Sequence, residues 1–358
     1  MPLRKIRDTI DTIDTQIIDL LAARVEAVHE VGLIKKAEGL QIYAPEREDA
    51  LLKALAKKNQ GRIPEHSLRA IYREIMSCAL HLEDELKIAY LGPEGTWTHQ
   101  AAAKKFGHSV DYLPHGNFAD VFDCVTRRHA NYGVVPIENS TEGAVSHTLD
   151  LFVDSPLRIC AQILLRIENG LIASIPKNEI KTLYSHPQVF GQCRNWILRN
   201  LPDADLVEVS STTKAAQLAK ENAAQGAAAM GGPLAAELNG LTLLESSIQD
   251  RATNTTRFLV IGEETCPPTG KDRTSILFAC HDRPGSLVKA LQCFDKLSIN
   301  MSKIESRPSK QKDWEYVFYV DFGGHCQDQE VKEALSELEQ HCSLVKILGS
   351  YPDLVTGD

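Results

Sequence analysis

An unbroken apolar stripe at the amino terminus restricts the fold of this chain more than any other feature. Its large aliphatic side chains recur at steps of three and four residues, the spacing of one helix face: Leu3, Ile6, Ile10, Ile13, Ile17 and Leu20. The stripe continues to about Lys36, which predicts about 50 Å of helix at about 1.5 Å per residue. Such a helix is too long for an isolated small domain, so the stripe requires a partner that covers it.

Arg24 occupies a slot on this stripe where a leucine is expected. A buried guanidinium without a partner is costly, so Arg24 predicts either a structural acid or an anionic ligand. Lys35 lies within about 20° of the same face and roughly 16 Å further along the axis, so the two cations could close on a small dianion. The alternative is a pair of snorkelling cations or a buried ion pair. Arg7 is about 26 Å from Arg24 along the axis, so it could serve only the site of a neighbouring chain.

Two more helices are expected, one from Pro45 and one after Pro64, which makes residues 1–86 an all-helical domain. Arg47 and Glu48, near the start of the second helix, add a cation and a carboxylate that can accept from a hydroxyl. With the closing third helix, one set of charged residues resembles the site of the all-helical chorismate mutases: Arg7, Arg24, Lys35, Arg47 and Glu48. Those enzymes are intertwined dimers in which one arginine of each site comes from the other chain.

The resemblance implies a role for each of these side chains in the rearrangement of chorismate to prephenate. This pericyclic reaction needs no nucleophile or base, but two carboxylates must be clamped and the negative charge on the ether oxygen must be stabilised. Arg7 and Arg24 would grip the carboxylates, and Lys35 would donate to the ether oxygen. Arg47 would add positive charge, and Glu48 would accept from the ring hydroxyl.

Three positions depart from the pattern of these mutases. Ala44 stands where an aspartate is common, Ala79 where a serine is common and Glu83 where a glutamine is common. Ala44 could still offer its backbone amide, whereas Ala79 removes one neutral donor, worth about 0.5–1.5 kcal/mol. Because a charged carboxylate would repel the developing oxyanion, Glu83 is expected to act in its protonated form. The alternative for Glu83 is a solvated residue in the last turn of its helix.

Residues 87–266 alternate short apolar runs with loops that are rich in glycine and hydroxyl groups and that open helices. This alternation predicts an α/β sheet, and such sheets bind ligands beyond the carboxyl ends of their strands, where helix amino termini attract anions. The loops contain few cations, so an anionic ligand would be held by backbone N–H groups and hydroxyls. Taken singly, each loop is better explained as an ordinary helix cap.

Four motifs in this segment closely resemble those of prephenate dehydratases: GPEGT (92–96), VVPIENSTEG (134–143), YSHPQ (184–188) and NTTRFLV (254–260). The resemblance implies a two-lobed fold like a periplasmic binding protein, with prephenate in the cleft. Thr256 would assist departure of the ring hydroxyl, and Arg257 is a carboxylate-binding or structural candidate. His186, Glu138 and Glu142 are further possible acids or positioning groups. The residues expected to bind prephenate are Glu94, Gly95, Thr96, Asn139, Ser140, Thr141, Ser185, His186, Ser211, Thr212, Thr255 and Arg257.

Residues 272–352 predict the order βαββαβ, a common ferredoxin-like arrangement that does not by itself indicate function. The stretches Arg283–Leu287 and Glu305–Pro308 resemble the ACT regulatory domain of dehydratases. The resemblance implies that phenylalanine binds between paired domains and inhibits the enzyme. Its expected contacts are Pro284, Gly285, Ser286, Leu287, Glu305, Ser306 and Arg307. The alternative is a plain dimerisation module.

Composition narrows the partners, the cell compartment and the cofactors that are expected for this protein. A net charge of −9 argues against nucleic acid or an anionic membrane as the main partner. Nine cysteines without a CxxC pair, an amino terminus without a signal-like apolar run, and no apolar stretch of transmembrane length predict a cytoplasmic protein. The sequence contains no HExxH, P-loop or GxGxxG motif, so neither a metal nor a cofactor is expected.

The predicted architecture has three parts: all-α helices, an α/β two-lobed domain and an α+β ferredoxin-like domain. Together the resemblances point to the bifunctional chorismate mutases/prephenate dehydratases, which convert chorismate to prephenate and prephenate to phenylpyruvate under feedback by phenylalanine. We expect a homodimer or a higher homo-oligomer. Two alternatives stay open: a dehydratase whose mutase helices serve only dimerisation, and a non-catalytic amino-acid sensor.

Overall fold

The computed structural model describes residues 2–38, 43–83, 85–251, 253–281, 283–309 and 316–353. The chain divides into two compact units, which are described separately. The first comprises Met1–Lys87 with Phe106–Asp111, and the second comprises Ile88–Lys105 with Tyr112–Asp358. Among the described residues, no helix combines the length and the apolar character needed to cross a bilayer.

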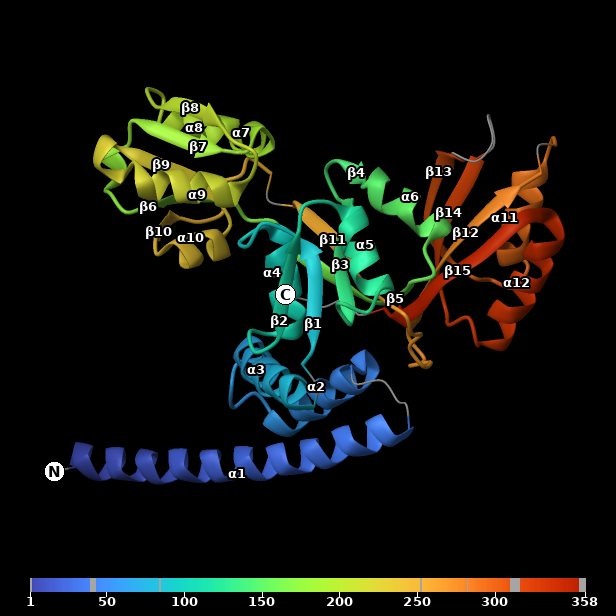
Figure 1. Cartoon of the computed structure of the whole chain (residues 1–358), viewed down its shortest axis with the longest axis horizontal. Coiled ribbons are helices and arrows are strands. Elements are labelled where there is room, and N and C mark those ends of the chain that lie inside the picture. Colours follow the sequence, from blue (N-terminus) through green and yellow to red (C-terminus); the bar gives the residue numbers. More distant parts are fainter. Residues whose placement is uncertain are drawn as a thin grey trace. The chain divides into compact units, whose positions relative to one another are not determined.

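The first unit is helical, as predicted: α1 (Pro2–Glu38), α2 (Pro45–Asn59) and α3 (Glu65–Glu83). The apolar periodicity of the amino terminus forms one continuous helix (Figure 1, dark blue). Proline stands at the first helical position of α2, where a missing N–H costs nothing. The short segment Phe106–Asp111 joins this unit, because the Glu74 carboxylate accepts from the backbone N–H of His108 (3.0 Å) and Ser77 Oγ accepts from that of Ser109 (3.0 Å).

The apolar stripe of α1 is largely uncovered within one chain. Its six side chains from Leu3 to Leu20 are each between 47% and 70% exposed. Monomeric soluble proteins rarely expose a continuous apolar surface of this kind. The partner required by the sequence is therefore absent from the chain's own described helices.

The middle of the chain forms two sheets, each with its own helices. The first sheet has the order β2-β1-β3-β11-β5, with β4 beside β3. Its strands are β1 (Lys87–Leu91), β2 (Asp111–His115), β3 (Tyr132–Asn139), β4 (Gly143–Ala144), β5 (Arg158–Arg166) and β11 (Thr255–Gly262). Its helices are α4 (Trp97–Phe106), α5 (Phe118–Thr126) and α6 (Ser146–Asp154).

The second sheet has the order β10-β6-β9-β7-β8. Its strands are β6 (Gly170–Ala173), β7 (Thr182–Ser185), β8 (Asp205–Glu208), β9 (Ala227–Gly231) and β10 (Thr242–Glu245). Its helices are α7 (Pro187–Gln192), α8 (Arg194–Asn200), α9 (Thr212–Glu221) and α10 (Pro233–Asn239). The chain leaves the first sheet after β5 and returns as β11, between β3 and β5, so the two-lobed α/β prediction is confirmed (Figure 1).

The carboxyl-terminal part has the predicted order βαββαβ: β12 (Asp272–Cys280), α11 (Ser286–Asp295), β13 (Met301–Pro308), β14 (Tyr316–Gly323), α12 (Gln329–His341) and β15 (Cys342–Pro352). Both faces of the antiparallel sheet β13-β14-β12-β15 (Figure 1, orange to red) are packed against other elements. Alternate side chains such as Phe278 and Phe322 pack against the helices, whereas Leu277, Tyr319 and Leu348 share a core with the first lobe.

The backbones of this sheet and of the first lobe approach closely. A side chain at Gly349 of β15 would place its Cβ 2.3 Å from the carbonyl oxygen of Ile159 in β5, so only glycine fits. The ferredoxin-like sheet therefore packs directly against the first lobe and shares a hydrophobic core with it. This contact determines which side chains on the back of the first sheet are buried.

Candidate functional site

Two of the predicted mutase side chains on α1 reach α3. Lys35 Nζ lies 3.0 Å from Glu83 Oε2, and these side chains are only 20% and 8% exposed. Arg24 Nη1 donates to the carbonyl oxygen of Ile75 at 3.5 Å. The structure therefore brings Arg24, Lys35 and Glu83 to the face where α1 meets α3, and Glu83 is not a solvated end-of-helix residue.

The other predicted mutase residues lie around this face or away from it. Ala79 is 5% exposed on α3, four residues from both Ile75 and Glu83 and thus on the same helix side. Arg47 is exposed and Glu48 half-buried in the first turn of α2, which follows the half-buried Ala44. Arg7 is exposed on α1.

A cavity of about 320 Å³ lies between the two lobes of the second unit. Its walls come from the ends of strands in both sheets and from the connections between the lobes. The predicted prephenate-site residues that line it are Thr96, Asn139, His186, Ser211, Thr212 and Thr256. No lysine or arginine is among the described residues of its lining.

The hydroxyl of Thr256 is held by Asn139. Asn139 Nδ2 donates to Thr256 Oγ1 (2.8 Å) and to Asn254 Oδ1 (2.8 Å). Asn139 Oδ1 accepts from the backbone N–H of Thr141 (2.9 Å) and from its hydroxyl (2.5 Å), which fixes the orientation of the amide. Because Thr256 Oγ1 accepts from Asn139, its own proton is free to be donated into the cavity.

The helix amino termini around the cavity supply partial positive charge. Ser211 Oγ accepts from the N–H of Lys214 (3.1 Å) and His186 Nδ1 from that of Gln188 (3.3 Å), so both side chains cap helices. Thr96 Oγ1 donates to the carbonyl oxygen of Leu91 at 3.0 Å. What these positions offer an anion is therefore the dipole of a first helical turn rather than a charged side chain.

Several residues predicted to bind prephenate do not line the cavity, and some of them form hydrogen bonds within the protein. Ser185 Oγ is buried and donates to the carbonyl oxygen of Met230 (2.9 Å). Ser140 Oγ accepts from the N–H of Thr255 (2.9 Å), which closes the loop after β3. Five more predicted residues are outside the lining: Glu94, Gly95, Thr141, Thr255 and Arg257.

The close approach of the two lobes explains why position 95, in the loop after β1, is a glycine. Gly95 has a φ of +81°, and a Cβ there would lie 3.0 Å from Thr213 Oγ1 on α9. A side chain at this position would be strained and would push the lobes apart.

Sequence reasoning missed several residues of the cavity wall, including Trp97, Ile167, Gln192 and Asn254. Ile167 and Asn254 belong to the two connections between the lobes, where the N–H of Ile167 donates to the carbonyl oxygen of Asn254 (2.8 Å). Two α7 residues of the lining, Gln188 and Gln192, also donate across the lobes to Glu142. A signal for Gln192 was available, because it lies four residues after the glutamine of the YSHPQ motif and so on the same helix side.

The predicted phenylalanine residues lie at the start of α11 and on β13. Gly285 has a φ of +82° immediately before α11, a conformation that favours glycine. Arg307 forms a two-pronged ion pair with Asp150 of α6 (Nε 2.9 Å, Nη2 3.2 Å) and donates to Ser146 Oγ (2.6 Å). This arginine therefore joins the carboxyl-terminal sheet to the first lobe.

One cluster in the described residues combines metal-ligand chemistry with partial burial. Ligand atoms of Cys293, Glu337 and His341 lie within 4.8 Å of one another. Glu337 is already paired with Lys296, whose ammonium opposes a second cation. The cluster is outside both candidate active sites.

Comparisons with known proteins agree with this architecture. Residues 6–84 match the family described as chorismate mutase type II, residues 88–266 match prephenate dehydratase and residues 274–340 match the ACT domain. A bifunctional chorismate mutase/prephenate dehydratase from Aquifex aeolicus (strain VF5) is 44% identical over 355 residues, 98% of each chain.

Two solved structures resemble the part of the chain that follows the helices. A prephenate dehydratase from Arthrobacter aurescens, in complex with L-Phe, matches with a TM-score of 0.69 and 34% identity over 75% of this chain and 90% of that one. A protein described as GqqA, a quorum quenching acylase, matches with a TM-score of 0.69 and 29% identity over 75% and 98%. Since the Aquifex relative covers the helices as well, the chain belongs to the bifunctional chorismate mutase/prephenate dehydratase family.

Proposed function

We propose that the two reactions of this family take place at two separate sites, with Lys35 and Thr256 as the central side chain of each. The observation that carries the proposal is the cavity between the lobes, into which Thr256 directs a hydroxyl that Asn139 holds at 2.8 Å. The mutase site would lie where α1 meets α3, with Arg24, Lys35 and Glu83 converging there.

In the cleft, prephenate would lose its ring hydroxyl and its ring carboxylate together, driven by formation of the aromatic ring. The Thr256 hydroxyl would donate to the departing oxygen as the C–O bond breaks, which assists departure even for a weak acid. The helix amino termini would hold the carboxylates through N–H groups. Because the described part of the wall has no lysine or arginine, the carboxylate that becomes carbon dioxide would have no strong counter-ion from it.

On the helices, Lys35 would stabilise charge on the ether oxygen, and Arg24 would hold a carboxylate. The exposed stripe of α1 would be covered by α1 of a second copy, which would also bring its Arg7 to the site. Arg47 and Glu48 would contribute from α2, as the resemblance to the mutases implies.

The carboxyl-terminal domain would bind phenylalanine between paired copies, near Pro284–Leu287 and Glu305–Arg307, and inhibit the dehydratase. A phenylalanine-bound relative with the same fold supports this proposal. Feedback of this kind has a coupling free energy of typically about 1–3 kcal/mol and is reciprocal. Prephenate should therefore weaken phenylalanine binding by the same factor by which phenylalanine weakens prephenate binding. If each ligand binds with the same affinity in the presence and in the absence of the other, the coupling is refuted.

One assay separates the alternatives. The full chain is supplied with chorismate and, separately, with prephenate, and phenylpyruvate is followed. Turnover of both supports the bifunctional enzyme, and turnover of prephenate alone indicates helices that serve only assembly. Turnover of neither indicates a sensor.

We propose a cytoplasmic location for the enzyme. The nine cysteines are not joined in disulfides in the structure, which is consistent with a reducing compartment.

A further inference from the structure

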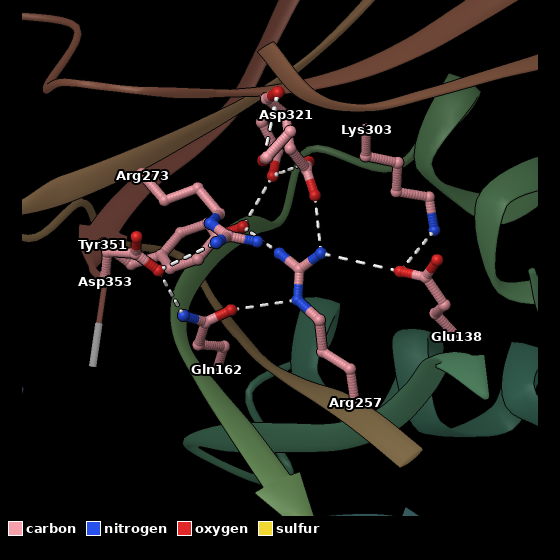
Figure 2. Close-up of polar contacts among 10 residues, drawn as sticks. Glu138, Gln162, Arg257, Arg273, Lys303, Asp321, Tyr351 and Asp353 are labelled. Atoms are coloured by element: carbon pink, nitrogen blue, oxygen red, sulfur yellow. Dashed lines mark hydrogen bonds and ion pairs between the residues drawn. The ribbon is translucent and has the colours of Figure 1, made fainter. Parts of the chain in front are cut away.

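Strands β3 and β11 present opposite faces to two different environments. In their antiparallel register Thr256 pairs with Asn139, and the next pair is Arg257 with Glu138. Successive side chains of a strand point to opposite faces of the sheet. Thr256 and Asn139 therefore line the cavity, whereas Arg257 and Glu138 point to the back of the sheet, toward the ACT domain (Figure 2).

Arg257 is bound on this back face by three acceptors. Its Nη1 donates to Asp321 Oδ2 (2.5 Å), its Nη2 to Tyr351 Oη (2.7 Å) and its Nε to Gln162 Oε1 (2.9 Å). Asp321 lies on β14 and Tyr351 on β15, so two of the three acceptors come from the ACT sheet (Figure 2). The side chain of Arg257 is 9% exposed and that of Asp321 is 10% exposed.

The ACT sheet holds the neighbouring residue of β3 as well. Lys303 Nζ of β13 lies 3.0 Å from Glu138 Oε2, and the same carboxylate oxygen is 3.9 Å from Arg257 Nη1. The ACT domain thus supplies an anion to the strand that carries Thr256 and a cation to the strand that carries Asn139 (Figure 2).

The network is anchored within the ACT sheet and leaves little freedom to its members. Ser275 Oγ of β12 donates to Asp321 Oδ1 (2.5 Å) and is 2.7 Å from Tyr351 Oη. Burial alone would lower the pKa of Arg257, but Tyr351, Asp321 and Glu138 raise it above its ordinary value, so the guanidinium is charged. A buried charge with fixed partners favours one arrangement of the strands that carry them.

We propose that Arg257 is a positioning residue for the dehydration: clamped by Asp321 and Tyr351 of the ACT sheet, it fixes the backbone of β11 so that Thr256 Oγ1 stays at hydrogen-bond distance from Asn139 and directed into the cavity. This inference rests on the proposed role of Thr256. It also names the contact through which the ACT domain acts on the dehydratase site, because the clamp is one residue from the reacting hydroxyl. Displacement of a catalytic group by about 1 Å is enough to lower turnover.

The test compares Arg257→Lys, Asp321→Asn and Tyr351→Phe in the full chain, with prephenate as substrate. We expect dehydratase kcat to fall by about 10-fold or more in the first two variants and by about 3-fold in the third, while KM changes by less than about 2-fold. The matched control is Asp150→Asn, which breaks the Arg307 ion pair across the same domain contact but lies on α6 rather than on β3 or β11. Its kcat should change by less than about 2-fold, and an equal loss in this control would overturn the proposal.

A double-mutant cycle separates positioning from general destabilisation. If Arg257 acts through Thr256, then adding Arg257→Lys to Thr256→Val should lower kcat by less than about 2-fold further, because the group that it positions is already gone. Full additivity of the two losses would contradict the proposal.

Thermal unfolding checks that each variant is folded. If Arg257→Lys or Asp321→Asn is not folded, the result for Tyr351→Phe decides, since this variant lacks only a single hydroxyl. Normal turnover in Thr256→Val contradicts the role of Thr256 itself, whereas normal turnover in Arg257→Lys beside an impaired Thr256→Val overturns the positioning role alone.

Discussion

The two candidate sites of this chain differ in their electrostatics, although the dianions proposed for them are related. The proposed helical site has long cationic side chains, Arg24 and Lys35, which reach α3 from one face of α1. The cleft has hydroxyls, amides and helix amino termini in its described wall, and the arginine that follows Thr256 on β11, Arg257, is turned to the back of the sheet. A reaction that builds charge on an ether oxygen favours a fixed cation, whereas a carboxylate that must leave as carbon dioxide is held back by one.

The sites also differ in what completes them. The cleft is closed by contacts within one chain, from the Glu142 bonds across the lobes to the ACT sheet behind β11. The helix that carries the other site, α1, has an exposed Arg7 and an uncovered apolar stripe. One site should therefore depend on assembly and the other on the contact between two domains of the same chain.

Removal of the Lys35 ammonium should have the largest effect. Lys35→Ala is expected to lower mutase kcat by about 10²–10³-fold, the range for loss of one donor to a developing oxyanion, with dehydratase turnover unchanged. Chorismate consumption and phenylpyruvate formation are followed separately. Lys36→Ala is the control, because Lys36 is the exposed next residue of the same helix. Parallel loss of both activities would show that the sites are not independent.

Loss of the Thr256 hydroxyl should be the matching change in the cleft. Thr256→Val is expected to cut dehydratase kcat by about 10²-fold or more, because the donor to the departing oxygen is gone, without unfolding the protein. Thr256→Ser, which keeps a hydroxyl beside Asn139, should retain most of the turnover. Near-normal turnover of the valine variant would remove Thr256 from the mechanism.

Mixing of two inactive variants tests whether the helical site is shared between chains. If Arg7 completes the site of a second copy, co-refolded Arg7→Ala and Lys35→Ala chains should regain about a quarter of the wild-type mutase activity, since half of the random dimers carry one intact site. Arg24→Ala with Lys35→Ala is the control and should regain none, because both residues belong to one chain's site. Absence of recovery in the first mixture would contradict a shared site.

The Glu83 side chain offers a smaller, pH-dependent test. Its contact with Lys35 places a carboxyl beside the proposed oxyanion donor. A mutase that requires protonated Glu83 should lose kcat/KM as the pH rises, and Glu83→Gln should shift the working range to higher pH. Glu83→Asp, which keeps the acid, serves as the control. An unshifted pH profile in Glu83→Gln would end the hypothesis.

The sequence predicted the helices and strands better than it predicted the contacts of individual side chains. The steps of three and four residues identified α1, and the alternation of apolar runs with helix-opening loops identified the two lobes, because both patterns are local. The loops after β1, β3 and β7 were placed at the cleft for the same reason. Alternation along β11 turns Arg257 away from the cleft, but the partner that it meets there, Asp321, lies 64 residues later along the chain. No local pattern encodes such a contact, and the same holds for Ile167 and Asn254, which meet only when the lobes form.

The buried phenol of Tyr351 provides the smallest expected effect and tests the domain contact without a catalytic readout. Burial, with Asp321 nearby, raises the pKa of Tyr351 to about 12. The unfolded chain releases this proton near pH 10, so between about pH 10 and 12 the unfolded state binds fewer protons and the free energy of unfolding falls as the pH rises. Urea unfolding, followed by circular dichroism at pH 9 and 11.5, should show wild type losing about 1–2 kcal/mol more than Tyr351→Phe. Equal losses would mean that the phenol proton is not held by the contact between the ACT sheet and β11, and the clamp on Arg257 would then be looser than its 2.7 Å bond to Tyr351 Oη indicates.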